Sequence, residues 1–295
     1  MPLSPDAQKL FDALGKEKLI CLLAPSFPVD FQFPEILTNL KKIWFKKTVE
    51  LTYAAKLING QYHELIKKDP SKQWICTNCP TIVGLVKSKY PQHKDKLIHI
   101  ASPMVIMSRF VKKEYWPEYK TVFVWPCLAK KLEAKQSGDV NYAVTFKELQ
   151  EVFNYFKEQN IPYQEVVWDT HNGLPDFDKF YNDYTKVYPL TGAVAQTMHY
   201  KDILRDDQVL IVDEIKNMDE AIKKFENNPD IKFFDPLACP GGCVGGPWVI
   251  SKELIETRIQ KVKDYKNHSH HKIHNPNIWK FKNAWDLDMC SRTVD

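Results

Sequence analysis

Seven cysteines are the residues of this 295-residue chain that offer the most chemistry. Four of them each follow a segment with the pattern of a β-strand: Cys79, Cys127, Cys239 and Cys243. Ligands of open α/β sheets bind beyond the carboxyl ends of the strands, so these four thiols are expected to meet at one place. Thiolate is the soft ligand that iron–sulfur clusters require. The pattern therefore predicts a metal–thiolate site and leaves the identity of the metal open.

Glycine is concentrated around two of these thiols. The segment Cys239–Gly246 reads Cys-Pro-Gly-Gly-Cys-Val-Gly-Gly. Glycine lets the backbone pass close to a bulky ligand and point N–H groups at its sulfur atoms. This composition favours a cluster over a single buried thiol.

Three other interpretations of the cysteines are considered. Cys76 and Cys79 could join Cys239 and Cys243 in a zinc site, but the pairs are far apart in sequence and lack ribbon turns. Cys76 and Cys79 could instead form a thioredoxin-type redox pair, which the residues between and after them support weakly. A lone cysteine is most often a small buried hydrophobe. We expect that role for the remaining three cysteines, Cys21, Cys76 and Cys290.

Strand and helix patterns alternate along the chain, which implies one or two largely parallel sheets. Glu148 and Thr145 have the spacing of a capping box. Strands are predicted at Lys18–Ala24, Gln73–Thr77, Leu97–Ala101, Thr121–Val124, Tyr142–Thr145, Gln164–Trp168, Val209–Val212 and Phe233–Ala238. Helices are predicted at Thr81–Lys89, Met104–Lys113, Glu148–Phe156, Ala193–Leu204 and Asp219–Phe225.

Composition is that of a soluble globular protein, with 44% hydrophobic and 26% charged residues. No apolar run of about eighteen residues occurs, and the first residues do not resemble a signal peptide, so we expect a cytoplasmic protein without membrane contact. The net charge is +4, and residues 261–295 hold seven Lys/Arg against four Asp. This basic end is interpreted as a solvated surface and not as a nucleic-acid site. Four histidines in Asn267–His274 are interpreted as an exposed polar loop.

Three cysteine motifs resemble, in order, the signatures of the [FeFe] (iron-only) hydrogenase family. Ile75–Pro80 resembles the first, Thr-Ser-Cys-Cys-Pro, and Trp125–Glu133 resembles the second, Met-Pro-Cys-x-x-Lys-Lys-x-Glu. Ala238–Gly246 resembles the third, Ala-Cys-x-Gly-Gly-Cys-x-x-Gly-Gly. Together these motifs are highly specific. Weaker similarities lie at Ala24–Ser26, Ala101–Met104 and Thr191–Val194, and the resemblance covers roughly Leu19–Ile250.

The resemblance implies one catalytic domain over residues 1–295, with two α/β lobes around a buried cluster and a basic, helical or irregular extension at 251–295. A [4Fe–4S] cube would be ligated by Cys79, Cys127, Cys239 and Cys243. Cys243 would bridge the cube to a diiron unit carrying carbon monoxide, cyanide and an azadithiolate. Lys130 would hold one cyanide through a charge-assisted hydrogen bond. The other cofactor-binding positions would be Pro25, Ser26, Pro103, Met104, Trp125 and Leu237.

Departures from the family pattern concern proton delivery. Asn78 stands where the family has its proton-relaying thiol, and an amide does not titrate in the useful range. Ile98 stands where the family has a proton-path serine; its neighbour His99 is titratable, although a structural role suits it better. Glu64 lies near the family's pathway glutamates in sequence.

The pocket around the diiron unit is also expected to be more apolar than in the family. Trp125 and Leu237 replace methionines, Met104 replaces a glutamine, and Pro247 and Trp248 follow the third motif. These features resemble the sensory-type branch of the family. Only Cys21 precedes Cys76, so the accessory clusters of the family's ferredoxin modules are not expected. Electrons would then come from an external carrier such as a ferredoxin.

The function expected from the resemblance is reversible H₂ oxidation and proton reduction, slowed by Asn78. Maturation proteins would be needed to install the diiron unit. Three alternatives are a hydrogen-sensing regulator with little turnover, a non-catalytic iron–sulfur protein, and a zinc-stabilised binding module.

Overall fold

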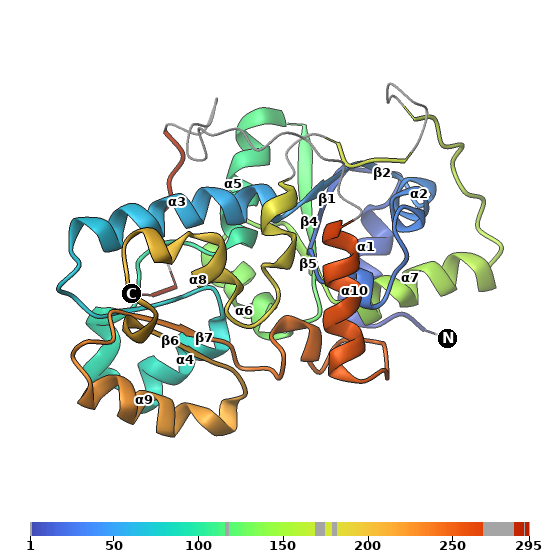
Figure 1. The fold of residues 1–295 in the computed structure, drawn as a ribbon. Coiled ribbons are helices and arrows are strands. Elements are labelled where there is room, and N and C mark those ends of the chain that lie inside the picture. The colour runs from blue at the N-terminus through green and yellow to red at the C-terminus, as the bar shows by residue number, and fades with distance from the viewer. Residues whose placement is uncertain are drawn as a thin grey trace.

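Two parallel sheets form the frame of the molecule (Figure 1). The computed structural model describes residues 2–115, 118–168, 175–178, 182–267, 286–291 and 293–294. The larger sheet has the strand order β2-β1-β4-β5, and the smaller sheet has the order β3-β7-β6. Every pairing between these strands is parallel, as the sequence predicts. The strands are β1 (Lys18–Leu23), β2 (Phe45–Glu50), β3 (Trp74–Ile75), β4 (Tyr119–Val124), β5 (Tyr142–Val144), β6 (Val209–Val212) and β7 (Phe233–Pro236).

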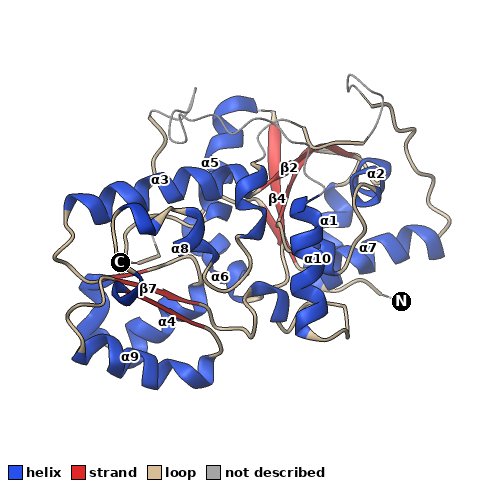
Figure 2. Cartoon of the chain, viewed as in Figure 1, coloured by secondary structure: helices blue, strands red, loops and turns tan. Residues whose placement is uncertain are grey.

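Helices cover both sheets (Figure 2). In the larger lobe, α5 (Pro103–Tyr115) packs on β1 and β4, and α3 (Thr52–Lys68) packs on α5. The other helices of this lobe are α1 (Pro5–Ala13), α2 (Glu35–Lys42), α6 (Ala129–Ser137) and α7 (Phe146–Glu158). The predicted capping box begins α7, where Thr145 and Glu148 each bond the backbone N–H of the other. Five successive residues of β1 are buried, because helices cover both faces of its sheet.

The smaller lobe has its own hydrophobic core. Helices α4 (Pro80–Lys89) and α9 (Met218–Asn227) pack on the three-stranded sheet, and the short helix α8 (Ala193–Thr197) contacts α3. The core joins apolar side chains of these elements, among them Ile75, Ile82, Val86, Ile222, Phe225 and Phe234. The expected fold class, α/β with parallel sheets flanked by helices, is confirmed.

Several local predictions were wrong. Strand β2 was missed because two lysines interrupt its apolar pattern at the edge of the sheet. The segment Leu97–Ala101 makes only isolated bridges, and Gln164–Trp168 is not a strand, because neither lies against a free sheet edge for its length. The helix predicted over Ala193–Leu204 ends at Thr197, and His199 then takes a left-handed backbone conformation.

The C-terminal region includes a helix that packs on three short 3-10 helices, which lie in connecting segments of the chain. Helix α10 (Ile255–Asn267) contacts the short 3-10 helices η1 (Phe27–Val29), η3 (Asp183–Val187) and η7 (Cys243–Gly245). Its Tyr265 hydroxyl donates to the buried carboxylate of Glu50 at the end of β2, 2.7 Å away. The histidine-rich segment lies outside the described residues beyond Asn267. None of the helices in the described ranges is both long and apolar enough to span a membrane.

Candidate metal centre

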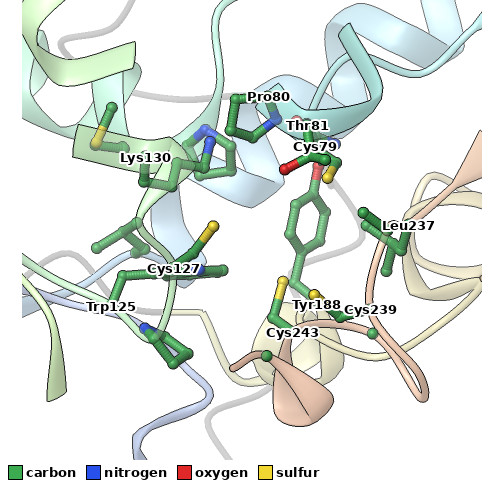
Figure 3. Close-up of a pocket in the computed structure, with 18 of the residues that line it drawn as sticks. Cys79, Pro80, Thr81, Trp125, Cys127, Lys130, Tyr188, Leu237, Cys239 and Cys243 are labelled. Atoms are coloured by element: carbon green, nitrogen blue, oxygen red, sulfur yellow. Dashed lines mark hydrogen bonds between the residues drawn. The ribbon is translucent and has the colours of Figure 1, made fainter. Parts of the chain in front are cut away.

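A pocket lies between the carboxyl ends of the two sheets, and the four predicted thiols line it. Cys127 follows β4 of the larger sheet, whereas Cys79 follows β3 and Cys239 follows β7 of the smaller one. Figure 3 shows the sulfur atoms of Cys79, Cys127, Cys239 and Cys243 around one space. The pocket holds about 700 Å³ of empty space, part of it open to solvent. The structure therefore brings these four thiols together in one pocket, as the sequence predicts.

Local backbone features place the thiols. Cys79 occupies the position before the first residue of α4, and Cys127 precedes the first turn of α6. The Cys243 N–H donates to Pro189 O at 2.7 Å, which ties the glycine turn to the segment after η3. Gly242 has φ +92°, and a Cβ there would lie 2.3 Å from the same carbonyl oxygen. Only glycine fits this position, as the turn composition suggested.

Electrostatics within the pocket disfavour free thiolates. Burial, and then Cys79 and Cys127, raise the pKa of Cys239 to about 12. Burial and the neighbouring thiols also raise the pKa of Cys243 well above its usual value, and nearby Lys130 partly offsets this rise. Burial raises the pKa of Cys127, while N–H groups of Lys130 and Ala129 lower it. Cys127, Cys239 and Cys243, whose ionisation is opposed in this way, need a metal cation to become thiolates together.

The four thiols are not arranged as a site for a single metal ion within the described residues. Across the described ranges, no three His, Cys, Asp or Glu side chains come together in a group that could hold one metal ion. A mononuclear zinc site would need its ligands within about 2.3 Å of one centre. The arrangement instead suits a larger body with several metal atoms, such as an iron–sulfur cube.

Lys130 lies at the pocket wall and is buried. Its ammonium group is 2.5 Å from Glu133 Oε2, one helical turn along α6, and both side chains are about 6% exposed. Lys130 is thus not a solvated residue on the exposed face of α6. Lys131 instead pairs with Asp6 and Glu148, away from the pocket lining.

The other predicted cofactor-binding residues divide into two groups. Pro103 and Met104 at the start of α5, together with Trp125 and Leu237, line the pocket. Pro25 and Ser26 are buried but are not among the lining residues, so their role stays a prediction. The Ser26 hydroxyl is buried and has no hydrogen-bond partner among the described residues. A buried hydroxyl of this kind is expected to meet a polar group that the polypeptide does not supply.

Asn78 lines the pocket, as expected for the residue before Cys79. Its Nδ2 donates to the Tyr188 hydroxyl at 2.8 Å and to Cys76 Sγ at 3.4 Å. Its Oδ1 is buried and has no partner among the described residues. This oxygen fits a pocket built for a ligand with polar groups.

The proposed outer proton groups do not reach the pocket. Glu64 on α3 and His99 are exposed, and neither is a lining residue. Ile98 is fully buried. The structure thus gives no support to a route through Glu64 or His99.

Sequence reasoning missed several residues of the site. Tyr188, Leu51, Phe123 and Val194 line the pocket. Behind it, burial raises the pKa of the Asp235 carboxyl to about 6, although the Ala195 N–H and the Cys76 thiol lower it. The sequence did contain a signal for Asp235, because a carboxylic acid stands there within an otherwise apolar predicted strand. Cys76 and Cys21 are buried and Cys290 is exposed, and none of them lines the pocket.

Fold and site define a two-lobed α/β protein with a four-thiol pocket between parallel sheets. Residues 17–247 match the family described as iron only hydrogenase large subunit, C-terminal domain. The chain belongs to this family, whose members bind iron–sulfur H-cluster cofactors.

Known proteins support the same assignment. The chain is 23% identical to iron hydrogenase 1 of Clostridium pasteurianum over 282 residues, which are 78% of this chain and 48% of that protein. It thus spans about half the length of this curated relative. A variant of [FeFe]-hydrogenase HydA1 from Chlamydomonas reinhardtii has a similar fold, with a TM-score of 0.65, 16% identity and 88% of each chain covered. A structure of HydA(deltaEFG), described as showing stepwise H-cluster assembly, gives 0.65 at 14% identity and covers 96% of this chain and 92% of that one.

Proposed function

We propose that this chain is an H-cluster domain that catalyses 2H⁺ + 2e⁻ ⇌ H₂ at a low rate. A [4Fe–4S] cube would be held by Cys79, Cys127, Cys239 and Cys243, with Cys243 bridging to a diiron unit. The observation that carries the proposal is the convergence of four thiols in one pocket of a chain of this family.

The bound cofactor would supply the redox chemistry and the site where hydrogen binds. The chain's own residues bind, orient and shield it. Lys130 would place a positive charge beside an anionic ligand such as cyanide, with Glu133 holding the ammonium group in position. Met104, Trp125 and Leu237 would exclude water and provide few hydrogen bonds. An external carrier such as a ferredoxin would supply electrons, maturation proteins would install the diiron unit, and the cytoplasm is the expected location.

Iron loading tests the cube. Anaerobic reconstitution should load about four irons per chain and produce a broad charge-transfer absorption. Cys127→Ser and Cys239→Ser should each lose most of this iron and absorption. Cys290→Ser is the matched control, because that thiol lies outside the pocket. Equal loss in all three variants would contradict the assignment.

Infrared spectroscopy tests the diiron unit. Protein matured with the diiron cofactor should show bands of metal-bound carbon monoxide and cyanide. Lys130→Ala should weaken cofactor retention, because an anion in an apolar pocket loses its partner. Lys130→Ala also leaves the buried Glu133 carboxylate without its ion-pair partner, which could destabilise the fold. The double variant Lys130→Met/Glu133→Gln removes both charges, so it tests the loss of the positive charge without an unpaired buried carboxylate. Lys131→Ala, whose partners lie away from the pocket, should retain the bands.

A hydrogen-sensing role is the second candidate, and the absence of a titratable group at Asn78 favours it. Full infrared bands with almost no turnover in the native protein would support sensing over catalysis. An intact cube without such bands would support a non-catalytic iron–sulfur protein. A single zinc ion per chain without iron binding would contradict the hydrogenase, the hydrogen sensor and the non-catalytic iron–sulfur protein alike. It would support the zinc-stabilised binding module instead.

A further inference from the structure

Tyr188 brings a phenol into a pocket that is otherwise mostly apolar. It follows η3, is 6% exposed and lines the pocket together with Asn78 and Cys243. Figure 3 shows its ring beside the thiols of Cys79, Cys239 and Cys243. The hydrogen bond recorded for its hydroxyl within the described ranges is the one that Asn78 Nδ2 donates, at 2.8 Å.

The direction of this bond is set by a ladder of hydrogen bonds behind Asn78. The ladder ends at Ile98 O, a carbonyl that can only accept, and Thr77 Oγ1 donates to it at 2.8 Å. Thr77 Oγ1 has then used its proton, so the Tyr62 hydroxyl, 3.1 Å away, must donate to Thr77. The oxygen of Tyr62 accepts the Thr77 N–H at 3.2 Å and faces the Cys76 thiol at 3.9 Å.

The thiol proton of Cys76 is therefore directed away from Asn78. It points to Tyr62, and the Asp235 carboxyl is a second acceptor for it. The sulfur can then only accept from Asn78, so the atom of Asn78 that faces it at 3.4 Å must be the donor Nδ2. These hydrogen bonds fix which atom of the Asn78 amide is the nitrogen and which is the oxygen, because the shape of the amide alone is the same in both orientations.

With the amide fixed, the Tyr188 oxygen is an acceptor from Asn78, and its own proton has no acceptor among the described residues. We infer that Tyr188 donates this O–H to an acceptor ligand of the bound iron unit, such as metal-bound cyanide, and that Asn78 positions the phenol for it. The inference rests on the proposed function. Tyr188 would be a cofactor-binding residue, and Asn78 a positioning residue that acts through it.

The environment also keeps Tyr188 protonated. Burial, followed by the neighbouring Tyr62, Cys76 and Asp235, raises the pKa of Tyr188 well above its usual value. The phenol is thus a hydrogen-bond donor across the working pH range and not a source of protons. The alternative to a cofactor-binding role is that Tyr188 is a buried core residue whose hydroxyl interacts with Asn78 alone.

The test compares two buried tyrosines that each lose one oxygen. Tyr188→Phe and Tyr265→Phe are matured in the full chain beside the native protein and matched for iron content. Tyr265 is buried, donates to Glu50 outside the ladder and does not line the pocket. We expect Tyr188→Phe to shift at least one infrared band of the metal-bound cyanide or carbon monoxide, and Tyr265→Phe to leave the bands in place.

Asn78→Ala provides a second variant that keeps the phenol. It should broaden the same band, because the hydroxyl is no longer held in one orientation. Sharp bands that neither Tyr188→Phe nor Asn78→Ala changes would overturn the inference and leave the proposed function intact. A native protein with no such bands after maturation would overturn both, and the iron-loading experiment would show which part of the cofactor is missing.

Discussion

At the scale of single residues, the proposed function makes Asn78 the residue that limits proton delivery to the pocket. A thiol at this position titrates and an amide does not, so Asn78→Cys should raise hydrogen evolution by the matured protein. General acid–base catalysis is worth about 10²–10⁴ in rate, and we expect a gain near the lower end of this range. Ile98, at the position expected for a second proton group, is buried and cannot titrate, so the gain should stay small.

Asn78→Ser is the matched control for this prediction. It removes the same amide but adds no group that titrates near neutral pH. Evolution is measured with a chemical reductant at equal diiron content, which is set by infrared intensity. A fast native protein, or equal gains from serine and cysteine, would show that protons enter elsewhere.

The sequence was informative about residues whose neighbours signal their chemistry. The four cysteines stand in recognisable turns next to proline and glycine, and all four line the pocket. Tyr188 had no such signal, because its partner Asn78 is 110 positions away. The ladder through Tyr62 and Thr77 likewise depends on α3 packing beside β3, which local patterns do not encode.

At the scale of elements, the glycine turn after β7 depends on close backbone approach. Gly242→Ala would place a Cβ 2.3 Å from Pro189 O at a φ of +92°. The turn must then move, which displaces Cys243 and breaks its bond to the same carbonyl. We expect a loss of iron binding and of at least about 2 kcal/mol in the free energy of unfolding.

Gly84→Ala is the control on a neighbouring helix. A Cβ at Gly84 in α4 meets nothing within 4 Å. It should therefore raise the free energy of unfolding by about 0.5–1 kcal/mol through helix propensity, and iron binding should not change. Urea unfolding of both variants without metal checks the pair, and a harmless Gly242→Ala would contradict the role of the turn.

Helix α10 is held by a buried polar contact. Tyr265→Phe removes the hydroxyl that donates to Glu50, whose carboxyl group then keeps, within the described ranges, the Thr52 hydroxyl as its donor. The loss should cost about 1–3 kcal/mol, the usual penalty for a buried group deprived of its partner. Tyr163→Phe, on an exposed tyrosine, should change stability by less than about 0.5 kcal/mol. Equal effects in urea unfolding would show that the contact contributes little.

Elements with regular burial were predictable, and those set by tertiary context were not. Strands β1 and β4 are apolar on successive residues because both faces are covered. Strand β2 carries two lysines and becomes a strand only because it pairs with β1 at the edge. The helix α8 stops after Thr197 where the chain turns at His199, a choice that depends on packing with η3 and α3.

At the scale of the whole molecule, two buried carboxyls link folding to pH. Burial raises the pKa of Glu50 to about 7 and that of Asp235 to about 6. The two carboxyls of the unfolded chain lose their protons near pH 4 to 4.5, while those of the folded chain keep them up to about pH 6 to 7. Their stabilisation is therefore complete below about pH 4 and is lost as the pH rises to about 7.

The metal-free protein should thus lose stability between pH 5 and 7.5, by roughly 3 kcal/mol for Glu50 if its pKa shift is fully expressed. Glu50→Gln and Asp235→Asn should each flatten this dependence, because an amide carries no proton to lose. Urea unfolding at a series of pH values checks this prediction. A native protein that gains stability over the range would show that other groups dominate the linkage.

The placement of the thiols on both sheets has a consequence in terms of chain topology. A cluster bound to Cys127 in one lobe and to three thiols in the other closes long loops of the polypeptide. Closing such loops removes conformations from the unfolded ensemble, as a set of cross-links does. Binding of the cluster and docking of the lobes would then be a single equilibrium. An iron chelator would act on this protein as a denaturant acts on others, by releasing the cross-link that limits its unfolded chain.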